Sequence, residues 1–331
     1  MSSHRFTFCI PNLNKIKYLP ACIESMLAQD CPDWQCVFVD GYSTDGSWEY
    51  MQKFSSDSRF ILIRGRKKGM YEDWNECLQH VNSEYFYFLT SDDTCFPELV
   101  STTTETLDTY PDVDVCHFQF STIDEAGETT QMPEVIIQSE FDLYQYIDKY
   151  AHRRDGTCEF FMHFIYGPLY RSITSLVFRK KLISKMKSFT SQYGSLGDYD
   201  WSMRLGLFTD ILYIPQLLAT WRVYQGQATQ KQSSSKNSRA ALEIAESNFN
   251  IFKDLSRVSS LKQFPDKNLV LSNLANEFAS DSYQEIIASG LFDKLFPFFL
   301  KNPNYLLSRI AKYLSMGKLY SVTGEKSLQS R

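Results

Sequence analysis

Acidic side chains follow two short apolar runs in the first hundred residues. Asp40 comes directly after residues 36–39, and the pair Asp92 and Asp93 follows residues 85–89. Carboxylate oxygens are the ligands that Mg²⁺ and Mn²⁺ prefer, and they also accept hydrogen bonds from a bound molecule. The alternative for each aspartate is structural, because the same side chain can cap the helix that comes next in the chain.

A further acidic group lies much later in the chain. Asp198 and Asp200 fall in a glycine-containing loop over residues 194–200, just before a predicted helix. A carboxylate in such a loop can take a proton from a hydroxyl group, which is general base catalysis. It can also cap the helix, and the two roles are compatible because a helix start would hold the carboxylate in place.

Strand and helix signals alternate over the first hundred residues, which is typical of a parallel sheet with connecting helices. Short apolar runs predict the strands, and apolar residues at spacings of three and four predict the helices. Ligands bind beyond the carboxyl ends of the strands in such sheets, so we expect Asp40 and the Asp92–Asp93 pair to face one crevice. The predicted strands are residues 6–10, 36–39, 60–63, 85–89, 113–120, 175–178, 211–214 and 217–223, and the predicted helices are residues 19–27, 48–54, 71–81, 97–107 and 201–207.

The composition is that of an ordinary globular protein, and it argues against several classes of function. The net charge of −5 does not suit a general nucleic-acid binder, because such proteins carry a surplus of Lys and Arg. The eight cysteines form no C-x-x-C pair, so they predict small buried side chains in a reducing compartment rather than a zinc or redox site. The short polar start and the lack of an apolar run of ~20 residues predict a cytoplasmic protein without a signal peptide or a spanning helix.

Several segments, taken in order, resemble the inverting family-2 glycosyltransferases, and in particular members that build bacterial surface polysaccharides. Each segment alone is a weak signal, whereas their joint order and spacing over residues 6–229 are specific. The segments are F-C-I-P-N-L-N at residues 8–14, similar to the opening strand and P-T-Y-N loop; residues 18–29, similar to the first helix; V-D-G-Y-S-T-D-G-S at residues 39–47, similar to D-G-S-T-D-G-T; K-G-M-Y at residues 68–71 with Asn75; F-L-T-S-D-D at residues 88–93, similar to the D-x-D region; and G-D-Y-D-W with R-L over residues 197–205, similar to E-D-x-D-x-x-x-R-L.

The resemblance implies the GT-A fold, an α/β fold whose mostly parallel central sheet is flanked by helices. It implies a catalytic domain over residues 1–230, with a nucleotide-binding half at residues 1–96 and an acceptor-side half at residues 97–230. The sequence becomes polar over residues 227–238 and helical in pattern beyond, so we expect residues 231–331 to form a helical C-terminal appendage. The implied reaction transfers a sugar from a nucleotide-diphosphate donor to an acceptor hydroxyl with inversion.

The resemblance also implies a role for each acidic site. Asp198 is the general base that takes the proton of the acceptor hydroxyl. Asp93 holds a divalent cation, Mn²⁺ or Mg²⁺, that stabilises the leaving diphosphate, while Asp92 contacts the donor ribose or supports the metal. The structural alternatives are that Asp92 and Asp93 cap the helix that starts near residue 97, and that Asp198 caps the helix predicted over residues 201–207.

Recognition of the nucleotide is implied for the first half of the domain. Asp40 accepts a hydrogen bond from an N–H group of the base, and the backbone of Pro11 and Asn12 contacts the base. Lys68 and Tyr71 border the nucleotide, or else are a solvated lysine and a packed aromatic ring. A pyrimidine base is the usual choice in the family, which favours a UDP- or dTDP-sugar over a GDP-sugar.

Two positions depart from the family pattern. Gly197 stands where a Glu is usual, and Tyr224 stands where a His that can contact metal or diphosphate is common. Arg222, in the same segment as Tyr224, fits either a contact with the diphosphate or a structural ion pair. These departures support a second interpretation, a catalytically silent protein of the same fold that binds sugar nucleotides or serves as a scaffold. A sugar-1-phosphate nucleotidyltransferase is disfavoured because residues 11–18 contain no glycine.

The C-terminal residues combine apolar and basic side chains. Residues 286–331 contain seven Lys or Arg and two acidic residues, a net charge of 7 − 2 = +5. A basic amphipathic helix can lie on an anionic membrane surface, which would suit a lipid-linked or other glycan acceptor at the inner face of the cell membrane. The alternative is packing of this helix on the catalytic domain or on a second copy of the chain in a homo-oligomer.

Overall fold

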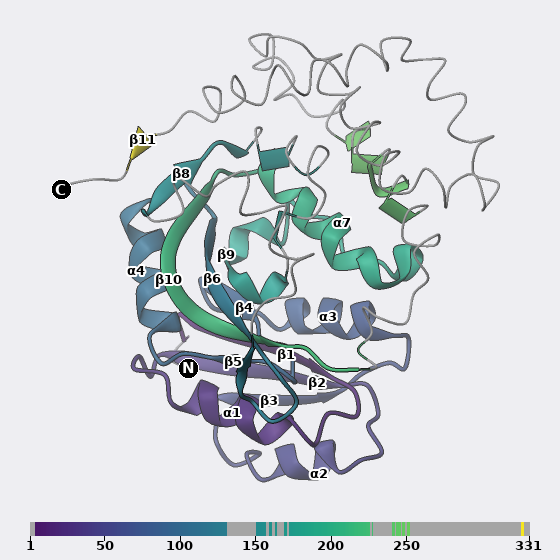
Figure 1. Cartoon of the computed structure of the whole chain (residues 1–331). Coiled ribbons are helices and arrows are strands. Elements are labelled where there is room, and N and C mark those ends of the chain that lie inside the picture. The colour runs from purple at the N-terminus through teal and green to yellow at the C-terminus, as the bar shows by residue number, and fades with distance from the viewer. Residues whose placement is uncertain are drawn as a thin grey trace.

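The computed structural model describes residues 4–130, 150–156, 159–160, 163, 169–170, 172–225, 227, 240–241, 243–245, 247–248, 250–251 and 326–327 (Figure 1). The predicted domain boundary at residue 230, almost all of the predicted appendage over residues 231–331, and Cys158 lie outside the described residues. The seven described cysteines are all free thiols, and all but Cys31 are buried.

The described strands form one mixed sheet in the order β11-β8-β10-β6-β9-β4-β1-β2-β3. The neighbours β3, β2, β1 and β4 are all parallel, as predicted, whereas β9 runs antiparallel to both β4 and β6. The strands are β1 (Phe6–Asn12), β2 (Trp34–Asp40), β3 (Phe60–Arg64), β4 (Tyr85–Phe88), β5 (Thr94–Cys95), β6 (Val115–Ile123), β7 (Thr129–Thr130), β8 (His152–Arg154), β9 (Leu176–Arg179), β10 (Ile211–Arg222) and β11 (Lys326–Ser327).

Helices cover both faces of the sheet (Figure 1). Side chains alternate along a strand, so Phe8 and Ile10 of β1 join one core cluster and Cys9 joins the other. The first cluster includes residues of α1 and α4, and the second includes residues of α3 and α7. The helices are α1 (Leu19–Leu27), α2 (Ser47–Gln52), α3 (Met70–Gln79), α4 (Leu99–Thr109) and α7 (Gly197–Met203), and the 3-10 turns are η1 (Ile173–Ser175), η2 (Lys180–Leu182), η3 (Ser191–Leu196) and η4 (Leu205–Leu207).

The predicted elements differ from the structure in two places. The strands predicted at residues 211–214 and 217–223 are one strand, β10, with register shifts on both sides of Leu217. Pro215 has no N–H group to donate, and such a residue is tolerated inside a sheet at an irregularity of this kind. The helix predicted from residue 201 begins at Gly197, so Asp198 lies in its first turn rather than ahead of it.

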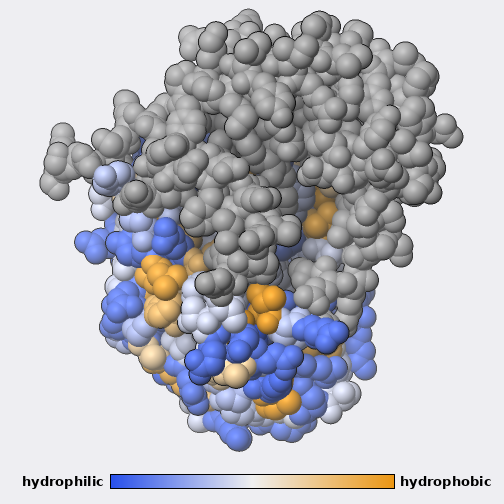
Figure 2. All heavy atoms as spheres, in the orientation of Figure 1, coloured by the Kyte–Doolittle hydropathy of each residue, from blue (hydrophilic) through white to orange (hydrophobic). Residues whose placement is uncertain are grey.

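Most of the described surface in Figure 2 is hydrophilic, with separate apolar patches. Within the described part of the chain, no helix combines the length and the apolar character that crossing a membrane requires.

Candidate functional site

The predicted site residues gather at one edge of the sheet. Because β1, β2, β3 and β4 are parallel, their carboxyl ends meet there, and α3 begins in the loop that follows β3. Asp40 is the last residue of β2, while Asp92 and Asp93 follow β4. Three exposed apolar side chains, Leu13, Tyr42 and Met70, stand in the loops and the helix start at this same edge. A sugar or a base could pack against such side chains.

Asp40 is buried and already bonded on both oxygens. Its Oδ1 accepts a hydrogen bond from Asn12 Nδ2 at 2.9 Å, and its Oδ2 accepts one from the Ser43 N–H at 2.9 Å. Arg64 adds an ion pair to Oδ2 at 2.5 Å. Asn12 lies opposite Asp40 in the β1–β2 ladder, where its carbonyl accepts a hydrogen bond from the Gly41 N–H, and Pro11 precedes it. The carboxylate is therefore held rigidly by its neighbours.

Asp93 is buried, and its carboxylate connects the loop after β4 to η1 and to the end of β10. Its Oδ1 accepts a hydrogen bond from the Arg222 N–H at 2.8 Å, and its Oδ2 accepts one from Thr174 Oγ1 at 2.8 Å and another from the Thr90 hydroxyl. Burial, and then the negative charge of Asp92, raise the pKa of Asp93 to about 7. Only 1% of Asp93 is exposed, so a ligand at the edge of the sheet cannot reach it without breaking these bonds.

Asp92 has more open surroundings and a basic partner. Its Oδ2 accepts a hydrogen bond from Lys15 Nζ at 2.7 Å and another from the Tyr224 hydroxyl at 2.9 Å. Burial and the Asp92 charge raise the pKa of Tyr224 well above its usual range, so this hydroxyl keeps its proton and donates it. Helix α4 has Glu98 at its N-cap position, which means that neither Asp92 nor Asp93 caps it.

Arg222 is a structural residue in this arrangement. Its Nε donates to the Asp92 carbonyl oxygen at 2.7 Å, and its Nη1 donates to the Asp124 carbonyl oxygen at 2.6 Å. The guanidinium carbon lies 4.8 Å from the centre of the Tyr18 ring, and Arg222 is buried. Arg222 thus joins the end of β10 to the loop after β4 through bonds to carbonyl oxygens, where the sequence offered a structural ion pair, and the offered contact with the diphosphate stays a prediction.

Asp198 is held by Tyr71. The Tyr71 hydroxyl lies 3.2 Å from Asp198 Oδ1 and accepts a hydrogen bond from the Asp198 N–H at 3.1 Å, while the Tyr199 N–H donates to Oδ1 at 2.9 Å. The other carboxylate oxygen, Oδ2, has no hydrogen-bond partner among the described residues. Burial raises the pKa of Asp198, and the hydrogen bonds from Tyr199 and Tyr71 oppose that rise. The arrangement leaves one fixed oxygen free to accept a proton.

Gly197 cannot be replaced by the usual Glu without a clash. A Cβ atom at this position would lie 2.4 Å from the Thr190 carbonyl oxygen and 2.5 Å from the Tyr71 ring. The Tyr71 ring also stacks on Phe189, with the ring centres 6.0 Å apart. The departure from the family pattern therefore has a packing reason, because the tyrosine that holds Asp198 takes the space of a side chain at residue 197.

Helix α3 lies between the surroundings of Asp40, where the nucleotide base is expected, and Asp198. Tyr71 in its first turn contacts Asp198, and Asp73 lies against the positions where Gly41 and Gly65 would carry a Cβ atom. Asp73 is buried and its Oδ1 has no hydrogen-bond partner. Burial, and then the charge of Asp40, raise the pKa of Asp73 to about 6. Lys68, in the loop before α3, is exposed.

The carboxylates at this edge do not fit a divalent cation as they stand. A cation of this kind, bound between protein and diphosphate, needs one or two protein oxygens that are free to coordinate it. Asp93 is buried with both oxygens bonded, and Oδ2 of Asp92 receives Lys15 and Tyr224. Oδ1 of Asp92 is the one oxygen of this pair without a hydrogen-bond partner among the described residues, and it belongs to a carboxylate that already pairs with the Lys15 ammonium. Among the described residues, no three or more His, Cys, Asp or Glu side chains form a group that could hold a metal. The predicted Mn²⁺ or Mg²⁺ stays a prediction.

Sequence reasoning missed several residues of this site. Lys15 and Arg64 were not singled out, although each follows or ends a strand at the edge where the ligand was expected. Asp73 was missed because it lies inside a predicted helix. The available signal was its spacing of four residues from Cys77, which places an acidic side chain on an apolar face of the predicted helix.

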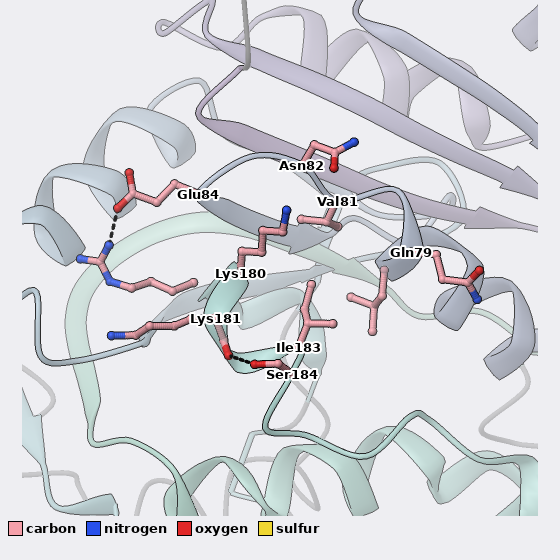
Figure 3. Close-up of a pocket in the computed structure, with 10 residues that line it drawn as sticks. Gln79, Val81, Asn82, Glu84, Lys180, Lys181, Ile183 and Ser184 are labelled. Carbon is pink, nitrogen blue, oxygen red and sulfur yellow. Dashed lines mark hydrogen bonds and ion pairs between the residues drawn. The ribbon is translucent and has the colours of Figure 1, made fainter.

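Figure 3 shows a pocket that none of these residues lines. It has a volume of about 660 Å³ and lies between the end of α3 and the turn after β9, where Lys180 and Lys181 are among the residues that line it. Arg179 pairs with Tyr85, the first residue of β4, so this pocket is at the amino end of β4 and the candidate site is at the opposite edge.

Residues 7–168 match the model of the family described as glycosyl transferase family 2. These residues form a glycosyl transferase family 2 domain. It is similar to the PGL/p-HBAD biosynthesis glycosyltransferase Rv2957 of Mycobacterium tuberculosis, with 33% identity over 98 residues, which are 29% of this chain and 38% of the relative. It is also similar to the putative teichuronic acid biosynthesis glycosyltransferase TuaG of Bacillus subtilis, with 31% identity over 85 residues, 25% of this chain and 34% of TuaG. The matched stretches thus span well under half of these relatives.

Solved structures share the fold of this chain. The S. aureus TarS fragment 1–349 in complex with UDP-GlcNAc superposes with a TM-score of 0.59 at 17% identity, covering 85% of this chain and 73% of that one. The mannosyltransferase PcManGT of Pyrobaculum calidifontis, in complex with GDP-Man and Mn²⁺, gives a TM-score of 0.54 at 13% identity, covering 96% and 86%. The prediction of an α/β fold of the GT-A type is confirmed.

Proposed function

We propose that this protein transfers a sugar from a nucleotide-diphosphate donor to an acceptor hydroxyl with inversion, in the synthesis of a cell-surface polysaccharide. The observation that carries the proposal is Asp198, a partly buried carboxylate that Tyr71 and the Tyr199 N–H hold in place, while its Oδ2 has no hydrogen-bond partner among the described residues. It lies at the edge of the sheet where Asp40 and Asp92 also lie, because Tyr71 stands in the first turn of α3. The proposed general base, Asp198, thus lies at the same edge of the sheet as the proposed donor site.

The proposed step is a single displacement. The acceptor oxygen attacks the anomeric carbon from the face opposite the diphosphate, and a new carbon–oxygen bond forms. The bond from the anomeric carbon to the diphosphate oxygen breaks, and its electron pair stays on the leaving nucleoside diphosphate. The acceptor proton moves to Asp198 Oδ2, which the raised pKa makes a better base than an exposed aspartate. One displacement inverts the configuration at the anomeric carbon.

A nucleotide sugar is the donor class that the relatives support. TarS was solved with UDP-GlcNAc, and PcManGT was solved with GDP-Man. For this chain we propose a UDP- or dTDP-sugar, with the base beside Asp40, Pro11 and Asn12. The acceptor would be a glycan or a lipid-linked sugar, in keeping with relatives named for PGL/p-HBAD and teichuronic acid biosynthesis.

The alternative is a catalytically silent protein that binds sugar nucleotides. Tyr224 in place of the usual His is the observation that favours it, since a protonated hydroxyl on Asp92 is a poor metal ligand. Gly197 no longer favours it, because the packing of Tyr71 explains that residue.

The decisive experiment measures both binding and turnover with a panel of UDP-, dTDP- and GDP-sugars. Thermal shift reports binding, since a ligand raises apparent stability by mass action, and release of the nucleoside diphosphate reports turnover, with water or a glycan as acceptor. Loss of a general base lowers rates by about 10²–10⁴, so Asp198→Asn should abolish release and preserve binding. Asp57→Asn, a matched change in the loop before β3, should leave both unchanged. Binding without release in the unmodified protein would establish the silent alternative.

A further inference from the structure

Lys15 occupies the corner of the site where a divalent cation would be expected. It stands in the loop between β1 and α1, and its side chain is 26% exposed. Its Nζ donates to Asp92 Oδ2 at 2.7 Å and also contacts the Tyr224 hydroxyl, which is 209 positions away in the chain. The ammonium lies 4.8 Å from the centre of the Tyr224 ring. The loop after β1 therefore supplies a positive charge to Asp92, and Tyr224, from the segment after β10, contacts both groups.

This arrangement opposes a second cation. A divalent ion on Asp92 would lie next to the Lys15 ammonium, and the two positive charges would repel each other. Tyr224 cannot replace the His of the family pattern as a ligand, because its hydroxyl keeps the proton that it donates to Asp92. Asp93, the other predicted ligand, is buried under bonds from Arg222 and Thr174.

The Lys15 ammonium can perform the task that the metal has in other proteins. An ammonium has three N–H donors, and the described contacts use two of them, on Asp92 and on Tyr224. A third donor remains for an oxygen of the diphosphate. Because Asp92 and Tyr224 hold the charge in place before the donor arrives, little reorganisation is needed as negative charge develops on the leaving group.

We infer that Lys15, held by Asp92 and Tyr224, supplies the positive charge that stabilises the leaving nucleoside diphosphate, and that transfer proceeds without a bound divalent metal. The inference rests on the proposed function and makes it more specific. It assigns Lys15 as a catalytic residue, and Asp92 and Tyr224 as residues that position it.

The first test measures nucleotide binding and does not require the acceptor. UDP and dTDP are titrated calorimetrically into the full chain, in EDTA and in Mn²⁺. The electron paramagnetic resonance signal of free Mn²⁺ is followed in parallel with UDP present. We expect a nucleotide to bind in EDTA, Mn²⁺ to change its dissociation constant less than twofold, and the free Mn²⁺ signal to persist.

The second test changes the lysine. A hydrogen bond to a charged group changes an equilibrium by about 10- to 100-fold, so Lys15→Met should weaken nucleotide binding in EDTA by that factor. It should also lower donor hydrolysis by about 10²–10³. Lys17→Met is the matched control, because that neighbour pairs with Glu125 at the surface and should leave both measurements unchanged. Lys15→Arg keeps the charge and should retain more binding than Lys15→Met, which separates a charge effect from misfolding.

Each outcome decides the inference. Nucleotide binding that requires Mn²⁺, or loss of the free Mn²⁺ signal in proportion to the protein, would overturn it while leaving the proposed function intact. Equal binding by Lys15→Met and the unmodified chain in EDTA would overturn it as well. If no nucleotide binds under either condition, the proposed function fails and the inference fails with it.

Discussion

The Tyr71 hydroxyl is the group that fixes the proposed base. It lies within hydrogen-bonding distance of Asp198 Oδ1 and of the Ser195 carbonyl oxygen, and it accepts the Asp198 N–H. Its hydrogen bond lowers the pKa of Asp198 against the rise that burial causes. At the scale of single residues, this geometry makes Tyr71 a positioning residue for the proposed base Asp198, and its predicted place at the border of the nucleotide stays a prediction.

Tyr71→Phe should change the pH profile as well as the rate. Without the hydroxyl, the pKa of Asp198 rises further, because burial is no longer opposed by this bond. A general base works only when deprotonated, so activity lost on acidification should be lost at a higher pH in the variant. We expect the turnover number to fall about tenfold at neutral pH, measured by nucleoside diphosphate release, since the bond is worth roughly 1–1.5 kcal/mol.

Tyr199→Phe is the control for this change. Tyr199 is a neighbour of Asp198 in α7, and its hydroxyl donates to the His163 carbonyl oxygen rather than to the carboxylate. Its pH profile should match that of the unmodified protein. A Tyr71→Phe profile that also matches would show that the hydroxyl has no part in setting the base.

The start of α7 depends on the absence of a side chain at Gly197. A methyl group there would meet the Thr190 carbonyl oxygen, which is backbone, and the Tyr71 ring. Overpacking of this kind costs about 1–3 kcal/mol, so Gly197→Ala should lower the free energy of unfolding by that amount in urea titrations. It should also reduce turnover, because the same shift displaces Asp198. A change in stability below about 0.5 kcal/mol would mean that the helix start adapts at no cost.

Asp73 makes α3 sensitive to pH. The folded state raises its pKa from 3.8 to about 6, so the folded protein binds a proton more tightly than the unfolded chain does. Below about pH 4 the Asp73 carboxyl is protonated in both states and does not lower the free energy of unfolding. This free energy falls as the pH rises from there through 6. The shift of about two units corresponds to roughly 3 kcal/mol at most at neutral pH.

Asp73→Asn should remove this cost. We expect its free energy of unfolding to exceed that of the unmodified chain by about 1–3 kcal/mol at pH 7.5 and to be nearly equal at pH 4. Urea titrations at the two pH values measure the difference. Glu49→Gln, which removes an acid in the first turn of α2, is the matched control. If the free energy of unfolding rises by the same amount at both pH values, the effect comes from packing and not from the charge of Asp73.

The sequence predicts elements well where one pattern dominates. The apolar runs around Phe8, Phe38 and Phe86 became β1, β2 and β4, in the parallel order that places the acidic residues at one edge. The bounds of two elements differ from the predicted ones. β10 continues across Pro215 because an irregularity absorbs the missing donor, and α7 starts at Gly197 because the packing of Tyr71 and Thr190 needs a glycine there. Neither cause is visible in a local pattern.

At the scale of the whole molecule, the site is made by contacts between distant segments. Asp92 and Asp93 are adjacent in sequence, yet Asp93 is bonded to Arg222, 129 positions away, while Asp92 meets Lys15 and Tyr224. Tyr71 reaches Asp198 across 127 positions. The sequence could predict that these acids lie at one edge. It could not predict which of them faces a ligand, because that depends on the packing of β10 and α7 against the first half of the sheet.

The charge distribution along the chain leads to a last prediction, on residues outside the described part. The whole chain has a net charge of −5 and residues 286–331 have a net charge of +5, so the net charge of residues 1–285 is −5 − 5 = −10. An anionic membrane would repel the larger part, and binding to it must come from the basic segment. Each Lys or Arg near such a surface contributes about 1 kcal/mol, an attraction that salt screens.

We expect the full chain to sediment with vesicles of phosphatidylglycerol and phosphatidylcholine at about 0.1 M salt, and to be released at about 1 M salt, where the Debye length is roughly 3 Å. Pure phosphatidylcholine vesicles should bind it far less. Changing Lys301, Arg309 and Lys312 together to Glu should abolish binding to the anionic vesicles while leaving thermal stability unchanged. If vesicles fail to bind the unmodified chain and the triple variant is destabilised, the basic segment packs on protein instead, because its charges then contribute to folding or to association of two copies.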